Sequence, residues 1–599
     1  MQFGDSAFAA FVDINKVKII IIITSIKKNI IALCAVCLII SAVFTFFYWN
    51  CIRNGVPLDY EGDSIAVLMG IKGYATGETN IFTPRYFHQL NAPGIGAWSD
   101  YPSEKLISCG AGMLVRCFGI TSGTTLAVLL LQLLAGVSFY CCGRLMAHKR
   151  IILIAGAILF GLAPYAFFRN LHHLTLTAYW DIPLMVVTLV WIAWPERVII
   201  SEKIGIYFAC GTAFIAGNFN PYYLGPFVVM LTLLTLGDII NLEWKKIRIF
   251  FSVILAAAAG IIVQNIDTFL YAAQNGENHQ AVSRDLWWMI KFGLFIPDMI
   301  FPRAHQNEFI NKISWAIYHG HVPPQIWGES QTAYIGIISV IGLLAMIISG
   351  ITLITAKKFD KISPFFWLTL GIVLFSVVGG VNYLLGSLGF LLLRSSNRSS
   401  IIISCMALYF LCEKLPKSLS RLWSVIIAVT LICVGIYDQI PKYPIWEENV
   451  REHTWRDFKS DSNFFAALEK TLPPKAMVFE LPVKDFPETG IVHNMGDYEH
   501  LRPALHTENL RFSYGTVKGR GDTDWQKAIA SQSALEMIQG LESFGFSSIL
   551  LNRKAYSDNG ADLQNKLTSA GAVLIMENAD FLIFRIKPSL TPVIPFKKV

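Results

Sequence analysis

Long apolar segments separated by polar stretches fill the first three quarters of the chain, and each is typical of a membrane-spanning helix. There are about eleven of them, at 29–48, 124–142, 151–168, 178–194, 204–218, 223–240, 248–265, 332–355, 364–386, 399–413 and 421–438. The pattern then changes. Helical periodicity and strand-like runs alternate from 441 to 599, which predicts a small α/β unit. We therefore expect a polytopic α-helical membrane domain, 1–440, and a C-terminal α/β domain, 441–599.

The elements expected in the C-terminal domain are short. Helical patterns cover 463–471, 528–544 and 562–570, and strand-like runs cover 476–481, 548–551, 572–576 and 581–586. At the other end of the chain, 29–47 is long enough for an uncleaved signal anchor, and 5–28 is expected to form a short interfacial helix.

Composition supports a membrane protein. Hydrophobic residues make up 54% of the 599 residues, charged residues only 15%, and the mean hydropathy is +0.50. These values exclude an ordinary soluble enzyme of this length. The 11 cysteines lie mostly in or beside apolar spans, and we interpret them as small packing residues.

Basic residues predict the orientation, because Lys and Arg collect on the cytoplasmic side. They cluster before the first span and after every second one, at Lys27, Lys28, Arg144, Lys149, Arg150, Arg197, Lys203, Lys245, Lys246, Lys357, Lys358, Lys414 and Arg421. The N-terminus is then cytoplasmic. The large loops 49–123 and 266–331 and the C-terminal domain are then extracytoplasmic. No nucleotide-binding motif occurs, so an activated substrate must arrive through the membrane.

Three carboxylates lie within five residues of a membrane boundary, in the segment that contains Asp59, Glu61 and Asp63. Acids near hydrocarbon lose hydration and repel one another, so their clustering favours a chemical role. The alternative is a solvated loop that simply carries acids. A positioned carboxylate can take a proton from an acceptor hydroxyl.

Cationic side chains occur on the same face. Arg394 and Arg398 flank the mouth of the tenth span, and Arg169, His172 and His173 follow the third. A planar guanidinium matches a phosphate well, although an Arg at a helix end also serves as an interfacial anchor. The His pair has no organised carboxylate partner in the sequence pattern, so we expect no metal and no other cofactor.

Two further regions offer groups for a sugar or an acceptor. Loop 266–331 is rich in polar and aromatic residues, including Arg284, Trp288 and Glu329, although aromatic residues also collect at any membrane interface. In the C-terminal domain, 497–506 and 514–520 form a polar patch with Lys518 and Arg520. This patch binds a glycan or a phosphate, or it fixes the domain by internal ion pairs.

Several short motifs together resemble the GT-C superfamily of membrane glycosyltransferases, and in particular a group of bacterial membrane proteins often labelled sugar translocases or phosphoglycerol-transferase-like. The residues that carry the resemblance are Tyr60-Glu61-Gly62-Asp63, Ser99-Asp100-Tyr101-Pro102, Pro164 to Arg169, His173, Tyr179, Asn220-Pro221-Tyr222-Tyr223, Glu329 with Tyr334-Ile335-Gly336, Arg394 with Asn397-Arg398, Asp438-Gln439, Phe479-Glu480-Leu481-Pro482, Asp497-Tyr498 and Tyr514 to Arg520. The resemblance implies that the extracytoplasmic side is the periplasmic face of a bacterial inner membrane.

The resemblance implies that Asp63 is the catalytic base, with Asp59 as backup and Asp100 as a second acid. Many members carry adjacent acids in this loop, whereas Asp59, Glu61 and Asp63 are spaced. It further implies an inverting transferase that uses undecaprenyl-phosphate sugar, expected to be glucose, and a lipopolysaccharide O-antigen or other surface polysaccharide as acceptor. Donor-phosphate binding falls to Arg394, Arg398, Arg169 and His173, and sugar or acceptor binding to Glu61, Arg284, Trp288, Glu329, Lys518 and Arg520.

Two other functions fit the same pattern. A lipid-linked sugar translocase would need polar residues distributed through the spans, whereas charges here gather at their external ends. A non-catalytic assembly subunit would not need the acids of the first loop. We do not expect a nucleic-acid partner, because no basic patch of that kind occurs.

Overall fold

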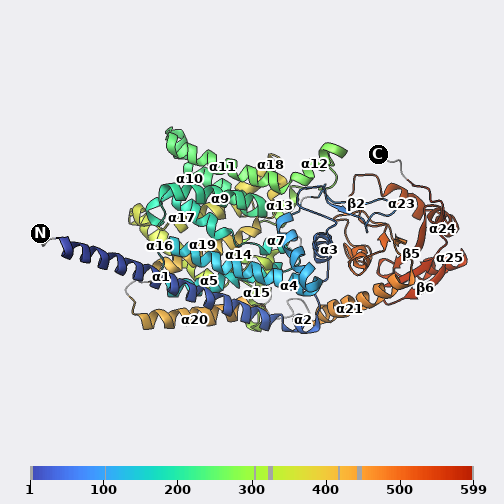
Figure 1. Cartoon of the computed structure of the whole chain (residues 1–599), viewed down its shortest axis with the longest axis horizontal. Coiled ribbons are helices and arrows are strands. Elements are labelled where there is room, and N and C mark those ends of the chain that lie inside the picture. Colours follow the sequence, from blue (N-terminus) through green and yellow to red (C-terminus); the bar gives the residue numbers. More distant parts are fainter. Residues whose placement is uncertain are drawn as a thin grey trace.

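A computed structural model of the chain describes residues 4–595 apart from 102, 283, 303–304, 322–327, 416–418 and 442–447, with the side chains of 4–25, 318–321, 330 and 448–453 also left out. It is a mostly helical molecule in which a bundle of long helices is followed by a segment built around a sheet (Figure 1).

Helices occur at all eleven predicted apolar segments. They are α1 (Gly4–Phe47), α4 (Lys105–Leu145), α5 (Arg150–Gly161) with α6 (Pro164–Arg169), α8 (Ile182–Ala193), α9 (Glu202–Phe219), α10 (Pro221–Ile240), α11 (Trp244–Gln264), α16 (Ile337–Thr355), α17 (Pro364–Ser376), α19 (Ser400–Lys414) and α20 (Arg421–Gln439). Within the described residues, seven helical stretches are long and apolar enough to cross a membrane. The protein is therefore a multi-pass membrane protein, and the count of eleven spans stays a prediction.

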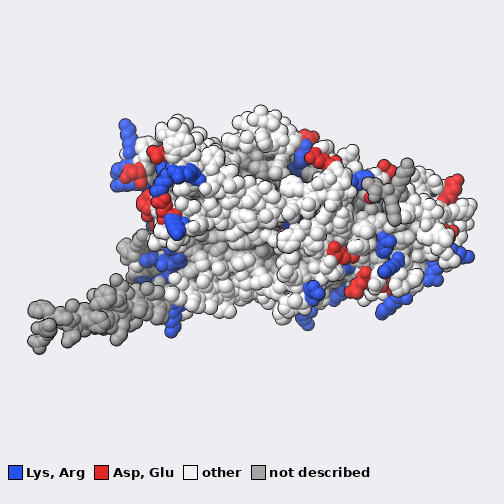
Figure 2. Space-filling view, turned by 45° about the horizontal axis from the view of Figure 1, so that its top comes forward, with Lys and Arg blue, Asp and Glu red and all other residues white. Residues whose placement is uncertain are grey.

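Charged side chains follow this arrangement. Figure 2 shows Lys, Arg, Asp and Glu gathered toward the two ends of one face of the molecule, with a largely uncharged band between them. Many apolar side chains of α10, α11, α16 and α20 are exposed, among them Leu233, Leu255, Ile348 and Val429. An apolar belt with polar ends is the surface that a lipid bilayer requires.

Three sequence expectations about the polar segments are wrong. The stretch 5–28 is helical but not a separate helix, because α1 continues through it without a break. Region 49–123 is not a continuous loop: it contains α2 (Trp49–Asn54) and α3 (Asp63–Thr76), and α4 begins at Lys105 and kinks at Gly119, where φ is 79°. Region 266–331 likewise contains helices, namely α12 (Ile266–Asn275), α13 (Trp287–Lys291), α14 (Ile296–Ile300) and α15 (Glu308–His321).

The C-terminal segment forms the predicted short elements. Helix α21 (Glu448–Thr471) leads into a five-stranded sheet of order β4-β3-β5-β7-β6, composed of β3 (Met477–Leu481), β4 (Arg511–Phe512), β5 (Phe546–Asn552), β6 (Val573–Glu577) and β7 (Phe581–Arg585). Strand β3 pairs in parallel with β4 and β5, and β7 is antiparallel to β5 and β6. The boundary at 440 stays a prediction.

One predicted helix of this segment is divided. The helical pattern over 528–544 becomes α23 (Asp524–Ala530) and α24 (Ala534–Ser543), while α25 (Ala561–Ser569) follows β5. The break is explained by Ser533, whose side chain caps α24 in a capping box with Glu536. The two-residue strand β4 is too short to leave a periodic signal in the sequence.

A buried charge cluster joins the segment between α3 and α4 to α4 itself and to α12. Asp267 Oδ2 accepts a bond from Arg85 Nε at 2.8 Å, and its Oδ1 lies 2.9 Å from Lys105 Nζ; none of the three side chains is more than 5% exposed. Because both cations pair with one carboxylate, the cluster fixes the start of α4 against α12.

Asp267→Asn is expected to destabilise the protein strongly, since it leaves two buried cations with one neutral amide. Breaking a buried ion pair costs roughly 3–5 kcal/mol. Thermal unfolding in nanodiscs should show a clearly lower midpoint. Asp562→Asn is the matched control, because its pair with Lys566 is exposed and worth about 0–1 kcal/mol. Equal midpoints for both variants would contradict the structural role of the cluster.

Candidate active site

The acidic segment 59–63 leads directly into helix α3. Asp63 is the first residue of α3, and Gly62 before it has φ 48° and ψ −127°. A Cβ on Gly62 would lie 3.3 Å from His172 Cε1. Glycine is therefore required here both by the backbone conformation and by the close approach of the imidazole. The local sequence thus presents the Asp63 carboxylate directly to the turn that follows α6.

That turn carries two histidines. Helix α6 ends at Arg169, Asn170 reverses the chain with φ 38°, and His172 and His173 precede α7 (Leu174–Thr177). Asp63 Oδ2 lies 3.5 Å from His173 Nε2 and 3.9 Å from His172 Nε2. His172 Nδ1 lies 3.5 Å from Asp59 Oδ2. The first external region and the turn after α6 therefore meet at one site.

Glu329 is the centre of a second cluster beside the first. Its Oε2 accepts a 2.6 Å bond from Arg169, and its Oε1 lies 3.3 Å from Arg398 and 3.8 Å from His173 Nε2. Arg169 also donates to Thr332 Oγ1 at 2.8 Å. His173 thus lies between Asp63 and Glu329 and joins the two clusters into one.

Two guanidinium groups of the cluster, those of Arg169 and Arg398, share the carboxylate of Glu329. The buried Nε atoms of Arg169, Arg398 and Arg394 have no hydrogen-bond partner within the described part of the chain. Arg398 stacks on Tyr222 with 4.0 Å from its guanidinium carbon to the ring centre, and Arg394 stacks on Trp288 at 4.7 Å. Orphaned guanidinium donors near one another favour binding of an anion such as phosphate.

Burial and charge set the protonation of these groups. Burial raises the pKa of Asp63, and His172 only partly offsets this. Burial by itself lowers the pKa of His172, but Asp59 and Asp63 outweigh it, so that the pKa of His172 is raised. Burial and Arg169 hold the pKa of His173 well below its ordinary value.

Glu329 behaves differently. Burial would raise the pKa of Glu329, but Arg169 and Arg398 hold it well below its ordinary value. Glu329 is thus a permanent anion that orients two cations. Asp63, whose pKa is raised, is the carboxylate suited to exchange a proton.

Three of these residues could hold a metal ion. Ligand atoms of Asp63, His172 and His173 all lie within 4.8 Å of one another. The sequence argument against a metal was that the His pair lacked an organised carboxylate partner; that premise is wrong, because Asp63 supplies one. The donor set of two imidazoles and one carboxylate fits a divalent cation such as Zn²⁺.

Three further predicted site residues, Asp100, Lys518 and Arg520, lie where the C-terminal segment meets the segment before α4 and the one after α12. Both oxygens of Asp100 are 2.5 Å from Arg520, and Asn278 donates to the same carboxylate at 3.1 Å. The Lys518 carbonyl accepts a 3.0 Å bond from Asn278. Asp100 and Arg520 thus form a bridge between two parts of the chain, the structural alternative raised for this patch.

Arg284 forms a second bridge. It pairs with Glu488 at 2.8 Å and lies 5.9 Å from the Trp288 ring centre, so Trp288 contacts both Arg284 and Arg394. Glu61 is beside Asp59 and contacts Thr454 Oγ1 at 3.5 Å. Trp288 therefore links Arg284 to Arg394, and Glu61 lies two residues from both Asp59 and Asp63.

Glu488 and Glu104, near the cluster, were not singled out from the sequence, and Tyr101 and Tyr498 entered only as parts of the motifs that carry the resemblance. The charge of Glu488 raises the pKa of Asp63. The charge of Asp63 in turn adds to the raised pKa of Tyr101 and of Tyr498, which burial causes first. Burial raises the pKa of Glu104, at the start of α4, to about 7, near Arg398. Lone Tyr and Glu residues far apart along the chain have no shared spacing, so no sequence signal could group them.

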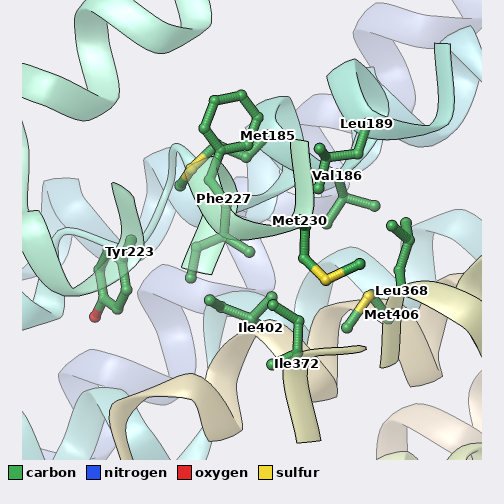
Figure 3. A pocket seen from close by; sticks show the side chains of 11 residues that line it. Met185, Val186, Leu189, Tyr223, Phe227, Met230, Leu368, Ile372, Ile402 and Met406 are labelled. Carbon is green, nitrogen blue, oxygen red and sulfur yellow. The ribbon is translucent and has the colours of Figure 1, made fainter. Parts of the chain in front are cut away.

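A cavity of about 20 Å³ lies elsewhere, between α8, α10, α17 and α19 (Figure 3). Its walls include Met185, Phe227, Met230, Leu368 and Met406. The space is that of roughly one water molecule, and the lining is apolar apart from Tyr223. The hydroxyl of Tyr223 is bonded to the Leu176 carbonyl at 2.6 Å. This cavity is a packing gap in the bundle with no chemical groups of its own.

Comparisons with known proteins give structural neighbours only, since no family model and no curated protein matches the chain. ArnT from Cupriavidus metallidurans, apo, is 13% identical with a TM-score of 0.44, covering 94% of this chain and 98% of that one. Oligosaccharyltransferase AglB from Archaeoglobus fulgidus, solved with an inhibitory peptide and a dolichol-phosphate, is 11% identical with a TM-score of 0.41, covering 92% and 73%. Arabinofuranosyltransferase AftD from Mycobacteria is 10% identical with a TM-score of 0.44, covering 92% and 41%.

Proposed function

We propose that the protein transfers a sugar from a polyprenyl-phosphate carrier to a hydroxyl acceptor on the external face of the membrane. The observation that carries this proposal is the cluster in which Asp63 faces His172 and His173, while Arg169 and Arg398 share Glu329 and keep buried Nε atoms without a partner among the described residues. Such a cluster combines a base with a phosphate site.

The reaction follows from these roles. Asp63 takes the proton of the acceptor hydroxyl as its oxygen attacks the anomeric carbon from the face opposite the phosphate. The bond between that carbon and the phosphate oxygen breaks, and the carrier leaves as its phosphate anion. Arg169, Arg394 and Arg398 stabilise the charge that develops on it, and a single displacement inverts the anomeric centre. Glu329 keeps two of these cations in place.

The finer assignments belong to the same proposal. The donor is undecaprenyl-phosphate glucose, and the acceptor is a lipopolysaccharide O-antigen or another surface polysaccharide of a bacterial inner-membrane system. Trp288 offers an aromatic face to a sugar ring, and Glu61 lies on the acceptor side of Asp63. Asp59 supports the charge of His172.

Activity should depend on pH through Asp63. The base works only when ionised, so the rate should fall as pH falls through its raised pKa. Asp59→Asn removes one of the two carboxylates that raise the pKa of His172, the one that contributes more. The pKa of His172 then falls, so the imidazole is uncharged over a wider pH range. An uncharged His172 does not lower the pKa of Asp63, so the acid limb of the pH–rate profile should move to higher pH. An acid limb that stays in place or moves to lower pH would contradict this arrangement.

Transfer should not need a bound metal. A carboxylate oxygen that binds a cation is a poorer base, and the guanidinium groups can meet the charge of the leaving phosphate. We expect the rate after dialysis against EDTA to stay within about twofold of the untreated rate, a difference of roughly 0.4 kcal/mol. If activity were lost and Mn²⁺ or Mg²⁺ restored it, Asp63, His172 and His173 would be metal ligands instead.

The proposal is tested with purified protein, radiolabelled undecaprenyl-phosphate glucose and a crude extract of surface glycolipids. Label that moves from the carrier to a new lipid or polysaccharide supports a transferase. A panel of other carrier-linked sugars distinguishes a wrong sugar from a wrong function. If the folded protein transfers none of them, the proposal fails and a translocase becomes the better account.

A further inference from the structure

The element that carries Asp63 lies between the helical bundle and the C-terminal segment (Figure 1). On one side, α3 packs against the start of α4, where Gly112 faces Tyr74 and Ala75 so closely that an added Cβ would come within 2.6 Å of Tyr74. Apolar packing over a glycine is not directional, so it leaves the rotation and the sliding of α3 to be fixed by other contacts.

Polar contacts to the C-terminal segment supply this restraint just before Asp63. The hydroxyl of Tyr60 donates to Asp461 Oδ2 of α21 at 2.8 Å and lies 2.9 Å from His506 Nε2. Since the phenol proton is used for Asp461, His506 must donate its Nε2 proton to the phenol oxygen. Arg502 holds both Asp461 oxygens, at 2.6 and 3.0 Å. Tyr60, Asp461 and Arg502 are each at most 3% exposed.

A second set of contacts lies on the other side of Asp63, near the end of α3. Lys72 is 9% exposed, and its Nζ donates to the carbonyls of Ala504 and Thr507, both at 2.5 Å, and to Gln89 Oε1 at 2.9 Å. Gln89 in turn donates to the Thr507 carbonyl at 2.8 Å. The acceptors are neutral, so this buried ammonium is held by geometry rather than by an ion pair.

Both sets of contacts end on one short stretch, 502–507, which contains α22 (Arg502–Leu505). We infer that this stretch is a positioning element for Asp63: it grips the chain three residues before Asp63 and nine residues after it, and so sets where the carboxylate points toward His172 and His173. The inference rests on the proposed function and gives the C-terminal segment a role in the chemistry. Tyr60 and Lys72 are positioning residues that touch no substrate.

The effect should appear in kcat. A misplacement of about 1 Å in a reacting group can cost on the order of 10²-fold in rate. In the double variant Tyr60→Phe/Lys72→Met, we expect kcat to fall about 10- to 100-fold, with KM for undecaprenyl-phosphate glucose changed less than about threefold, because the phosphate site lies on α6 and near α19.

A second readout separates positioning from general stability. Asp63 is surrounded by His172, His173, Glu329, Glu488 and Asp497, and its pKa is raised mainly by burial. A loosened α3 changes the 3.9 Å distance between the carboxylate and His172, so the acid limb of the pH–rate profile should move away from its wild-type position in the double variant. Hydrogen exchange of the amides in 61–76 should be faster, while that of α5 should be unchanged.

Ser533→Ala is the matched control. It removes the cap of α24 in the same C-terminal segment, a modest local destabilisation, without touching α3. It should leave kcat, the acid limb and the exchange of 61–76 as in the wild type.

The outcomes are distinguishable. If Asp63→Asn abolishes transfer while the double variant keeps wild-type kcat, acid limb and exchange rates, the positioning inference is wrong and the proposed function stands. If Asp63→Asn retains full transfer, the proposed function is wrong. If exchange of 61–76 is faster in the double variant but kcat and the acid limb are those of the wild type, Tyr60 and Lys72 stabilise α3 without positioning Asp63, and the positioning inference is wrong.

Discussion

Asp63→Asn lowers kcat for sugar transfer by about 10²–10⁴-fold, because a positioned general base contributes about that much. Asn keeps the size of the side chain and cannot accept the acceptor proton. Binding of the carrier phosphate should be retained, since the guanidinium groups are unchanged. Single-turnover transfer of radiolabelled sugar measures the effect.

Asp457→Asn is the control for this variant. Asp457 is an acid on α21 near the same loop, and its carboxylate lies 3.6 Å from Lys554 rather than facing the histidines. It should retain nearly full kcat. If Asp63→Asn and Asp457→Asn behaved alike, Asp63 would not be the base.

Arg398→Gln is expected to lower kcat by about 10²–10³-fold, the usual effect of removing one donor that stabilises developing negative charge. The side chain is 8% exposed, stacks on Tyr222, and has a buried Nε with no partner within the described chain. Its loss removes a donor for the leaving phosphate and weakens the restraint on Glu329. Native mass spectrometry should also show weaker retention of undecaprenyl phosphate.

Arg197→Gln provides the comparison. Arg197 is 41% exposed and lies beside Glu413, at the end of the bundle predicted to be cytoplasmic. The Arg197→Gln variant should bind undecaprenyl phosphate and transfer sugar as the wild type does. Full activity in Arg398→Gln would remove this residue from the phosphate site.

Much of the fold follows from the sequence because its signals are local. Apolar runs locate the helices of the bundle, and periodicity locates the predicted strands, which became β3, β5, β6 and β7. Local signals fail where a helix is not apolar throughout. Helix α3 and the first turns of α4 were assigned to a loop because polar residues interrupt their apolar pattern. The partners of these residues are distant in sequence: Lys72 bonds the carbonyls of Ala504 and Thr507, and Lys105 pairs with Asp267, which periodicity alone does not reveal.

The candidate site was predicted only in part. The sequence identified Asp63, Arg169, His173, Glu329 and Arg398, since acids and cations near a membrane boundary are unusual. Their pairing could not be read, because Arg169 and Glu329 are 160 residues apart and Arg398 and Glu329 are 69 apart. The pairing of Asp100 with Arg520 could not be read for the same reason, because the two residues are 420 apart. Asp100 was therefore predicted as an acid for chemistry without its partner in view.

The central claim is that an Asp63-dependent sugar transfer takes place at the external end of the bundle. Proteoliposomes that contain labelled undecaprenyl-phosphate glucose in both leaflets, with acceptor glycolipid added outside, test it most directly. The account predicts that label becomes covalently attached to the acceptor with the wild type and not with Asp63→Asn. Label that crosses the membrane yet stays on the carrier, equally in both proteins, would contradict the account.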